Sequence, residues 1–174
     1  MGLTPAELTV LGLLVERPRH GYDLEQVIEQ RGVRRWTDIG FSSIYYLLGK
    51  LEKRGLVVAV QDRPAATSRR VFRVTAEGER VTAAETARFI AEAEPVPQPA
   101  LVGLANQTLL PEQDYAAALR TRLAGIEARL ASVRAAEQAQ APLPRPAREV
   151  FSYSVSLLEA ERSWLAARVE AQDG

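Results

Sequence analysis

Three apolar stripes at helical spacing occupy the first part of the chain, up to Gly55. The first begins after Thr4, a residue type that caps helices, and ends before Pro18; the second lies within residues 20–32. The third lies within residues 41–57 and ends at Gly55, which suits a left-handed helix end. The residues expected to be buried in these stripes are Leu8, Leu11, Leu14, Val15, Tyr22, Leu24, Val27, Ile28, Ile44, Leu47, Leu48 and Leu51. This pattern predicts three consecutive short helices.

Two short segments rich in β-branched and aromatic residues come next. Residues 56–62 and 69–75 have the composition of strands, and the polar, proline-containing segment 63–68 between them predicts a β-hairpin. Thr75 then caps a further predicted helix, whose expected buried residues are Val81, Ala84, Phe89 and Ile90. Prolines in residues 95–99 end this helix, so we place a domain boundary between residues 1–94 and 95–174.

The rest of the chain, residues 95–174, is expected to be helical. Its apolar residues recur at steps of four and three, which is the heptad spacing of a coiled coil. One predicted helix carries Leu119, Leu123, Ile126, Leu130 and Val133, and a second carries Phe151, Val155, Leu158, Leu165 and Val169. Because two helices cannot bury both apolar faces by themselves, we predict that these residues form a homodimer interface.

Three helices followed by a hairpin predict a mainly α fold of the winged helix-turn-helix type, joined to a C-terminal α-helical dimerisation domain. In this arrangement the third helix lies in the major groove of DNA, and the two-stranded hairpin forms the wing. The formal net charge is zero, yet residues 31–73 contain ten basic and three acidic residues, whereas residues 87–174 contain nine arginines and eleven acidic residues. The positive excess therefore falls on the predicted helix and wing.

The candidate DNA contacts lie on the outer side of the third helix and on the hairpin. Ser42 and Ser43 stand at the helix start, where backbone N–H groups and hydroxyls can bind a phosphate. Tyr45 and Lys50 lie off the apolar stripe and can reach base edges or phosphate oxygens, with Tyr46 near the boundary of the stripe. The remaining candidates are the cations Lys53, Arg54, Arg63, Arg69 and Arg70. The three hairpin arginines are spaced to straddle a backbone or enter a minor groove.

Each of these residue types also has a purely structural interpretation. Serines before an apolar helix commonly cap it, and tyrosines beside leucines commonly pack. Lys53 and Arg54 equally suit the negative end of a helix dipole. His20 is expected in a structural position near a helix start, and the two tryptophans, Trp36 and Trp164, in the core or at an interface.

Three segments follow one another in the first half of the chain: residues 8–24 (LTVLGLLVERPRHGYDL), 42–57 (SSIYYLLGKLEKRGLV) and 68–79 (SRRVFRVTAEGE). In sequence and in order they resemble the PadR family of bacterial transcriptional regulators. The resemblance implies that Tyr45 contacts DNA and that the long tail forms the dimer, as in the longer PadR proteins. It also implies a homodimeric repressor. Two recognition helices related by a two-fold axis predict an inverted-repeat operator, and release by a small-molecule effector is compatible with this arrangement. The chain departs from the family at Ser42 and Tyr46, where glycine and proline are common.

The composition argues against other classes of function. The chain has no cysteine, a single histidine and no glycine-rich phosphate loop, so no metal site, cofactor or enzymatic activity is expected. No apolar run is long enough to span a membrane and no export leader is visible, which predicts a cytoplasmic protein. The expected partners are double-stranded DNA, a second copy of the chain and an effector. The alternative is a winged-helix module that binds protein rather than DNA.

Overall fold

The structure, a computed structural model, describes residues 2–37, 39–40, 43–61, 70–93 and 96–173. Contacts between residues divide the chain into two compact units, Met1–Pro95 and Val96–Gly174. The first unit contains helices and a small sheet. The described residues of the second unit form helices and no strands.

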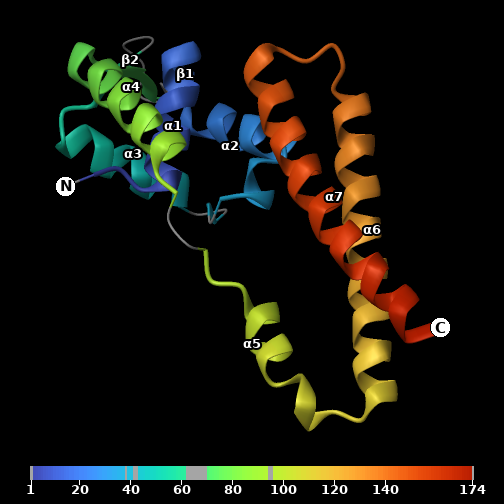
Figure 1. The fold of residues 1–174 in the computed structure, drawn as a ribbon. Coiled ribbons are helices and arrows are strands. Elements are labelled where there is room, and N and C mark those ends of the chain that lie inside the picture. The colour runs from blue at the N-terminus through green and yellow to red at the C-terminus, as the bar shows by residue number, and fades with distance from the viewer. Residues whose placement is uncertain (1, 38, 41–42, 62–69, 94–95, 174) are drawn as a thin grey trace. The chain divides into compact units, whose positions relative to one another are not determined.

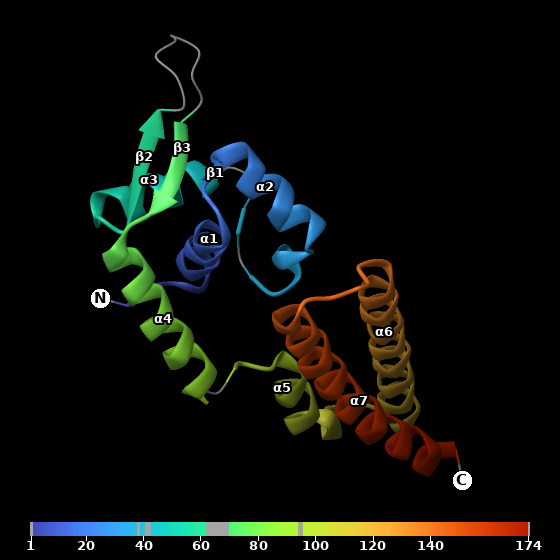
Figure 2. The ribbon, with the colours of Figure 1, turned by 90° about the horizontal axis from the view of Figure 1, so that it is seen from above.

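The first unit is a winged helix (Figures 1 and 2). Its elements in order are α1 (Pro5–Glu16), β1 (Arg19–His20), α2 (Gly21–Gln30), the 3-10 helix η1 (Val33–Arg35), α3 (Ser43–Lys53), β2 (Val57–Gln61), β3 (Arg70–Val74) and α4 (Ala76–Ala91). The strands form an antiparallel sheet in the order β1-β3-β2. The hairpin was predicted, whereas β1 was not, because two residues are too few to show a strand pattern. The wing therefore belongs to a three-stranded sheet.

The helix ends follow the capping rules that the sequence suggested. The Thr4 side chain accepts a hydrogen bond from the N–H of Glu7 at 3.2 Å, and the Glu7 carboxylate accepts one from the N–H of Thr4 at 2.8 Å. These two bonds form a capping box. Gly32 follows α2 and Gly55 follows α3, both in the left-handed conformation, with φ of 63° and 69°.

The core of the first unit is built mainly from the predicted stripes. Leu11, Leu14, Leu24, Ile28, Ile44, Leu48 and Leu51 are all fully buried. Val15 and Tyr22 were expected inside but are 47% and 51% exposed. Conversely, Val10 and Leu13 are buried, because α1 packs against α3, α4 and β3 and so buries more than one side.

α4 buries less of its surface than its sequence predicted. Ile90 is 81% exposed and Ala84 is also exposed, so both were wrongly expected in the core, while Val81 and Phe89 are half-buried. The buried residues of α4 are instead Gly78 and Thr82. A Cβ on Gly78 would lie 2.1 Å from the Leu56 carbonyl oxygen, so α4 meets the base of the wing through backbone rather than through large side chains.

A single residue, Thr75, joins β3 to α4. Its N–H donates to the carbonyl oxygen of Leu56 at 3.0 Å, and its hydroxyl donates to that of Gly55 at 2.8 Å. The same hydroxyl oxygen accepts a hydrogen bond from the N–H of Gly78 at 3.0 Å, which caps α4 as predicted. Figure 2 shows α4 leaving the end of β3 directly.

The second unit contains α5 (Pro99–Ala105), the 3-10 helix η2 (Gln107–Leu109), α6 (Glu112–Ala139) and α7 (Arg145–Asp173). α6 and α7 lie side by side as an antiparallel pair (Figures 1 and 2). Ion pairs Arg122–Glu161 and Arg134–Glu159 link the two helices. The short helix α5 lies in the part expected to be helical, but it was not predicted as a separate helix, because seven residues next to prolines show too little periodicity.

Candidate nucleic-acid interface

Helix α3 presents two different faces. Ile44, Leu47, Leu48 and Leu51 bury one face in the core of the first unit. On the other face Tyr45 is 63% exposed and Tyr46 is 71% exposed, so both rings stand in solvent near the helix start. Tyr46 is therefore not a packing residue. Tyr45 packs only in part, against Gly21 at the start of α2. An exposed pair of aromatic rings on a rigid helix is suited to contact a partner.

Ser43 begins α3, and its hydroxyl is engaged locally. The Oγ donates to the carbonyl oxygen of Gly40 at 2.7 Å, and the Ser43 N–H reaches the same oxygen at 3.3 Å. The lone pairs of the hydroxyl remain able to accept. Three further predicted contacts, Ser42, Arg63 and Arg69, lie outside the described residues.

The sequence suggested that the Lys50 side chain extends freely into solvent, but in the structure it pairs with Glu7. Its ammonium lies 2.9 Å from Glu7 Oε1, and the Arg54 guanidinium lies 3.4 Å from the same oxygen. The Glu7 side chain is only 1% exposed, whereas Lys50 and Arg54 are 39% and 30% exposed. Glu7 in α1 therefore holds two of the predicted DNA-binding cations, Lys50 of α3 and Arg54, the residue that follows α3.

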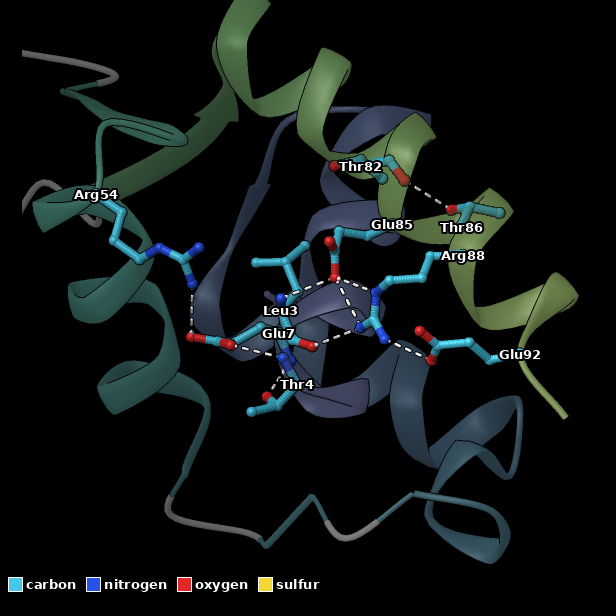
Figure 3. Close-up of polar contacts among 9 residues, drawn as sticks. All are labelled: Leu3, Thr4, Glu7, Arg54, Thr82, Glu85, Thr86, Arg88 and Glu92. Carbon is cyan, nitrogen blue, oxygen red and sulfur yellow. Dashed lines mark hydrogen bonds and ion pairs between the residues drawn. The ribbon is translucent and has the colours of Figure 1, made fainter. Parts of the chain in front are cut away.

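The surroundings of Glu7 favour its charged form. Burial alone would raise the pKa of the carboxyl group. The hydrogen bond from the Thr4 N–H and the nearby Lys50 ammonium lower the pKa, and together they outweigh burial, so the pKa lies below its usual 4.5. Glu7 is thus an ionised carboxylate at neutral pH. Figure 3 shows it between the N-terminal residues of the chain and Arg54.

A second polar cluster connects the N-terminus with α4 (Figure 3). Glu85 Oε2 accepts hydrogen bonds from the N–H of Leu3 and from Arg88 Nη2, both at 2.9 Å. Arg88 also pairs with Glu92 at 2.6 Å. The bond from Arg88 lowers the pKa of the Glu85 carboxyl group. The residues just before α1 are therefore fixed to α4, and Glu7 fixes α1 to α3.

The remaining predicted cations differ in their pairing. Arg70 pairs with Glu52 at 2.7 Å, and its guanidinium lies 5.2 Å from the centre of the Phe72 ring. Its carbonyl oxygen lies 3.2 Å from Nδ1 of His20, the residue before α2, which joins the wing to the helix-turn-helix. Lys53 is exposed and makes no ion pair with any residue that the structure describes. Among the predicted cations that the structure describes, Lys53 is therefore the most available to a phosphate.

Three residues of the first unit that were not predicted as DNA contacts are either exposed or in contact with α3. Tyr22 at the start of α2 is 51% exposed, and its hydroxyl accepts a hydrogen bond from Gln26 at 3.1 Å. Trp36 is 56% exposed, so it does not lie in the core, and the expected position at an interface stays a prediction. Gly21, the first residue of α2, lies against the ring of Tyr45. No local pattern could have indicated this last contact, because it joins two helices.

The predicted dimerisation residues pack chiefly within one chain. Nine of the ten take part in the core between α6 and α7, in which Leu119, Ile126, Leu130, Leu158 and Leu165 are buried. Phe151 is half-buried and is not part of this core. The periodic residues therefore have partners inside the chain, and any contact with a second copy needs further surface.

α7 carries a second apolar stripe that faces solvent. Val150, Tyr153, Leu157 and Trp164 are 43%, 70%, 56% and 38% exposed. Pro146, Ala160, Ala167 and Ala171 are exposed as well and continue the same steps of four and three along the helix. We call these eight residues the outer stripe. No large apolar residue of α6 is comparably exposed, so the unpartnered apolar surface of the helix pair lies on α7.

Two other features were sought in the described part of the chain, a metal-binding cluster and a membrane-spanning helix. No group of three or more His, Cys, Asp or Glu side chains there is placed to hold a metal ion. None of its helices combines the length and the apolar character that crossing a membrane requires.

The fold and this surface define the class of protein: a winged helix-turn-helix with an appended pair of long helices. The family model described as the transcriptional regulator PadR-like family matches residues 10–84. This part of the chain is therefore similar to the PadR-like family of transcriptional regulators. A comparison with curated protein sequences finds no match.

Solved structures share the fold over nearly the whole chain. Bacillus subtilis PadR in complex with operator DNA has a TM-score of 0.76 at 16% identity, over 97% of this chain and 99% of that chain. The same protein in complex with p-coumaric acid has a TM-score of 0.77 at 19% identity, over 97% and 98%. The Vibrio cholerae virulence activator AphA has a TM-score of 0.72 at 18% identity, over 96% and 97%. At these identities the likeness is one of fold.

Proposed function

We propose that the chain is a homodimeric, DNA-binding transcriptional regulator whose helix α3 enters the major groove. The observation that carries the proposal is the two-faced nature of α3, with its leucines fixed in the core and Tyr45 and Tyr46 exposed at its start. A similar fold is known in a complex of Bacillus subtilis PadR with operator DNA. Residues 1–94 would form the DNA-binding domain, and residues 95–174 the dimerisation domain.

The individual residues have distinct roles in this proposal. Tyr45 and Tyr46 contact base edges or sugar-phosphate, and Ser42 and Ser43 contact a phosphate at the helix start. Lys53 supplies a phosphate contact, joined by Arg63, Arg69 and Arg70 from the wing. Lys50 and Arg54 act mainly on the position of α3, because Glu7 engages both of them. The alternative, a module that binds protein through the same surface, predicts no dependence on duplex DNA.

The test is retention of a duplex containing the region upstream of the chain's own gene, measured over a range of salt concentrations. We expect affinity to fall steeply with salt, and Lys53→Gln to reduce the slope by about one, because one phosphate is no longer neutralised. Arg80→Gln is the matched control, because Arg80 is an exposed cation of α4 that pairs with Glu77. An absence of salt-dependent retention for the unsubstituted protein would favour the protein-binding alternative.

For the homodimer, we propose that the outer stripe of α7 packs against the same stripe of a second copy. Its steps of four and three over eight exposed positions support a coiled-coil seam, and two such helix pairs would complete a four-helix bundle. Leu157→Glu should convert the dimer to a monomer in sedimentation velocity. Ser156→Glu is the matched control, since Ser156 is exposed and lies off both stripes. A Leu157→Glu protein that stays dimeric would exclude this interface.

Two recognition helices related by a two-fold axis would contact half-sites about 34 Å apart in an inverted repeat. We propose repression as the outcome, although the similar fold of AphA belongs to a protein described as an activator. A reporter fused to the upstream region, compared with and without the chain, distinguishes the two signs of regulation. Footprinting on the same region measures the half-site spacing.

We also propose control by a small-molecule effector, because a protein of similar fold, Bacillus subtilis PadR, is known in complex with p-coumaric acid. An effector changes DNA occupancy only through its differential affinity for the free and the DNA-bound states. p-Coumaric acid is the first probe, added to the retention assay and to calorimetry of the free protein. Binding that leaves DNA retention unchanged would contradict its role as an effector.

A further inference from the structure

Gly21 has no evident conformational reason to be glycine. It is the first residue of α2, and the described glycines with positive φ are Gly32 and Gly55 instead. Within a helix, glycine is less favourable than alanine. The reason for glycine at this position is therefore the room available for a side chain rather than the backbone conformation.

The space beside Gly21 is taken by the ring of Tyr45. A Cβ added to Gly21 would lie 2.6 Å from Tyr45 Cε1, 2.9 Å from Cζ and 3.3 Å from Cδ1, and these are its three nearest neighbours. Two of these distances are too short for carbon atoms in contact. The ring thus occupies the volume that any side chain at position 21 would need.

This contact does little to bury Tyr45. The side chain remains 63% exposed, although Gly21 itself is buried beneath it. A contact that leaves the ring mostly in solvent contributes modestly to the core, but it restricts where the ring and its hydroxyl can point. The exposed ring is therefore placed in advance, and less of its freedom is lost on binding.

We propose that Gly21 is a positioning residue for DNA recognition, which seats the Tyr45 ring against the start of α2 and so fixes the direction of its hydroxyl. The inference rests on the proposed function, because Tyr45 must contact DNA for its position to matter. It also gives a role to the glycine of the segment HGYDL, residues 20–24, which the proposed function leaves unexplained.

The test compares four full-length variants, Gly21→Ala, Tyr45→Ala, the double variant and Gly12→Ala, on the duplex from the chain's own upstream region. Gly12 is the matched control, because it lies in α1 and a Cβ there would meet nothing within 4 Å. We expect Gly21→Ala to fold with an unchanged or higher unfolding midpoint and to bind about tenfold more weakly, as for one displaced base contact. Its salt slope should be unchanged, since no charge is altered.

The double variant decides whether Gly21 acts through Tyr45. In the Tyr45→Ala background, alanine at position 21 should have no further effect on affinity. A Gly21→Ala protein that binds like the unsubstituted one, or whose weaker binding persists fully without Tyr45, overturns the inference while leaving the proposed function intact. Failure of the unsubstituted protein to bind any duplex overturns both.

Discussion

Replacing Glu7 by glutamine removes the charge that holds α3 to α1. Glu7 Oε1 lies 2.9 Å from the Lys50 ammonium and 3.4 Å from the Arg54 guanidinium, and its carboxylate caps α1 through Thr4. Glutamine has nearly the same shape and keeps one oxygen for the Thr4 N–H. The substitution therefore removes the charge and the oxygen that faces Lys50 and Arg54, with little change of shape.

The burial of the three groups sets the magnitude. Removing one partner of a fully buried ion pair costs about 3–5 kcal/mol, whereas an exposed pair contributes about 0–1 kcal/mol. Here the carboxylate is 1% exposed but its partners are 39% and 30% exposed, so both cations regain water when the charge is removed. We expect an intermediate decrease of about 2 kcal/mol in the free energy of unfolding of the first unit.

The decrease should depend on pH in a defined direction. Because the folded-state pKa of Glu7 lies below its usual 4.5, the carboxylate stabilises the fold above that pH. This contribution declines as the pH falls from 4.5 through the lower, folded-state pKa. The difference between the unsubstituted protein and Glu7→Gln should accordingly be largest at neutral pH and should shrink in acid.

Urea denaturation followed by circular dichroism measures the change, and hydrogen exchange with mass spectrometry assigns it to α1 and α3 rather than to α6 and α7. Lys50→Met and the double variant complete a cycle that isolates the Glu7–Lys50 pair. Glu77→Gln, in an exposed pair of α4, should leave stability unchanged. Equal unfolding free energies for Glu7→Gln and the unsubstituted protein at neutral pH would refute this account of the carboxylate.

Three further substitutions test packing and backbone conformation by urea denaturation. Gly78→Ala places a Cβ 2.1 Å from the Leu56 carbonyl oxygen, and should cost about 1–3 kcal/mol; a silent substitution would mean that α4 can shift freely. Leu165→Ala, at a side chain with 0% exposure in the second unit, should cost about 2–5 kcal/mol, against little change for the exposed Leu109→Ala. Gly55→Ala forces alanine to a φ of 69° and should cost about 1–2 kcal/mol, whereas Gly55→Asn should cost less. Equal stability with glycine, alanine and asparagine at position 55 would show that the helix end can rearrange.

Local rules predicted the elements of this fold well. Thr4 and Thr75 cap their helices as expected, and Gly55 ends α3 in the left-handed conformation. Each of these features depends on a few neighbouring residues, and the apolar stripes depend on a regular period. The resemblance to the PadR family was accordingly recognisable from the first half of the chain, and the PadR-like family model matches residues 10–84.

Burial was harder to predict where the tertiary environment decides it. Val15 and Ile90 continue apolar stripes, yet both are exposed, because periodicity along one helix does not reveal how far its packing partners extend. β1 forms only because β3 lies beside residues 19–20. The outer stripe of α7 was visible in the sequence as a second register, but the inner register, which pairs with α6, was taken as the whole seam.

Contacts between distant residues account for what the sequence could not reveal of the site. Glu7 and Arg54 are 47 positions apart, so nothing in the segment around Lys50 indicated a buried carboxylate beside it. Gly21 and Tyr45 likewise meet only through the packing of α2 on α3. Spacing along one helix predicts which side chains share a face, but it does not show which residue of another helix occupies that face.

The one-residue joint between the wing and α4 has a consequence for length variation in this part of the chain. Thr75 makes hydrogen bonds to Gly55, Leu56 and Gly78, so an extra residue at this joint cannot be accommodated without breaking some of them. One inserted residue would rotate the start of α4 by about 100° about its own axis and turn Gly78 away from the Leu56 carbonyl. Insertions and deletions between residues 74 and 78 should therefore be far less tolerated than conservative substitutions at the same positions.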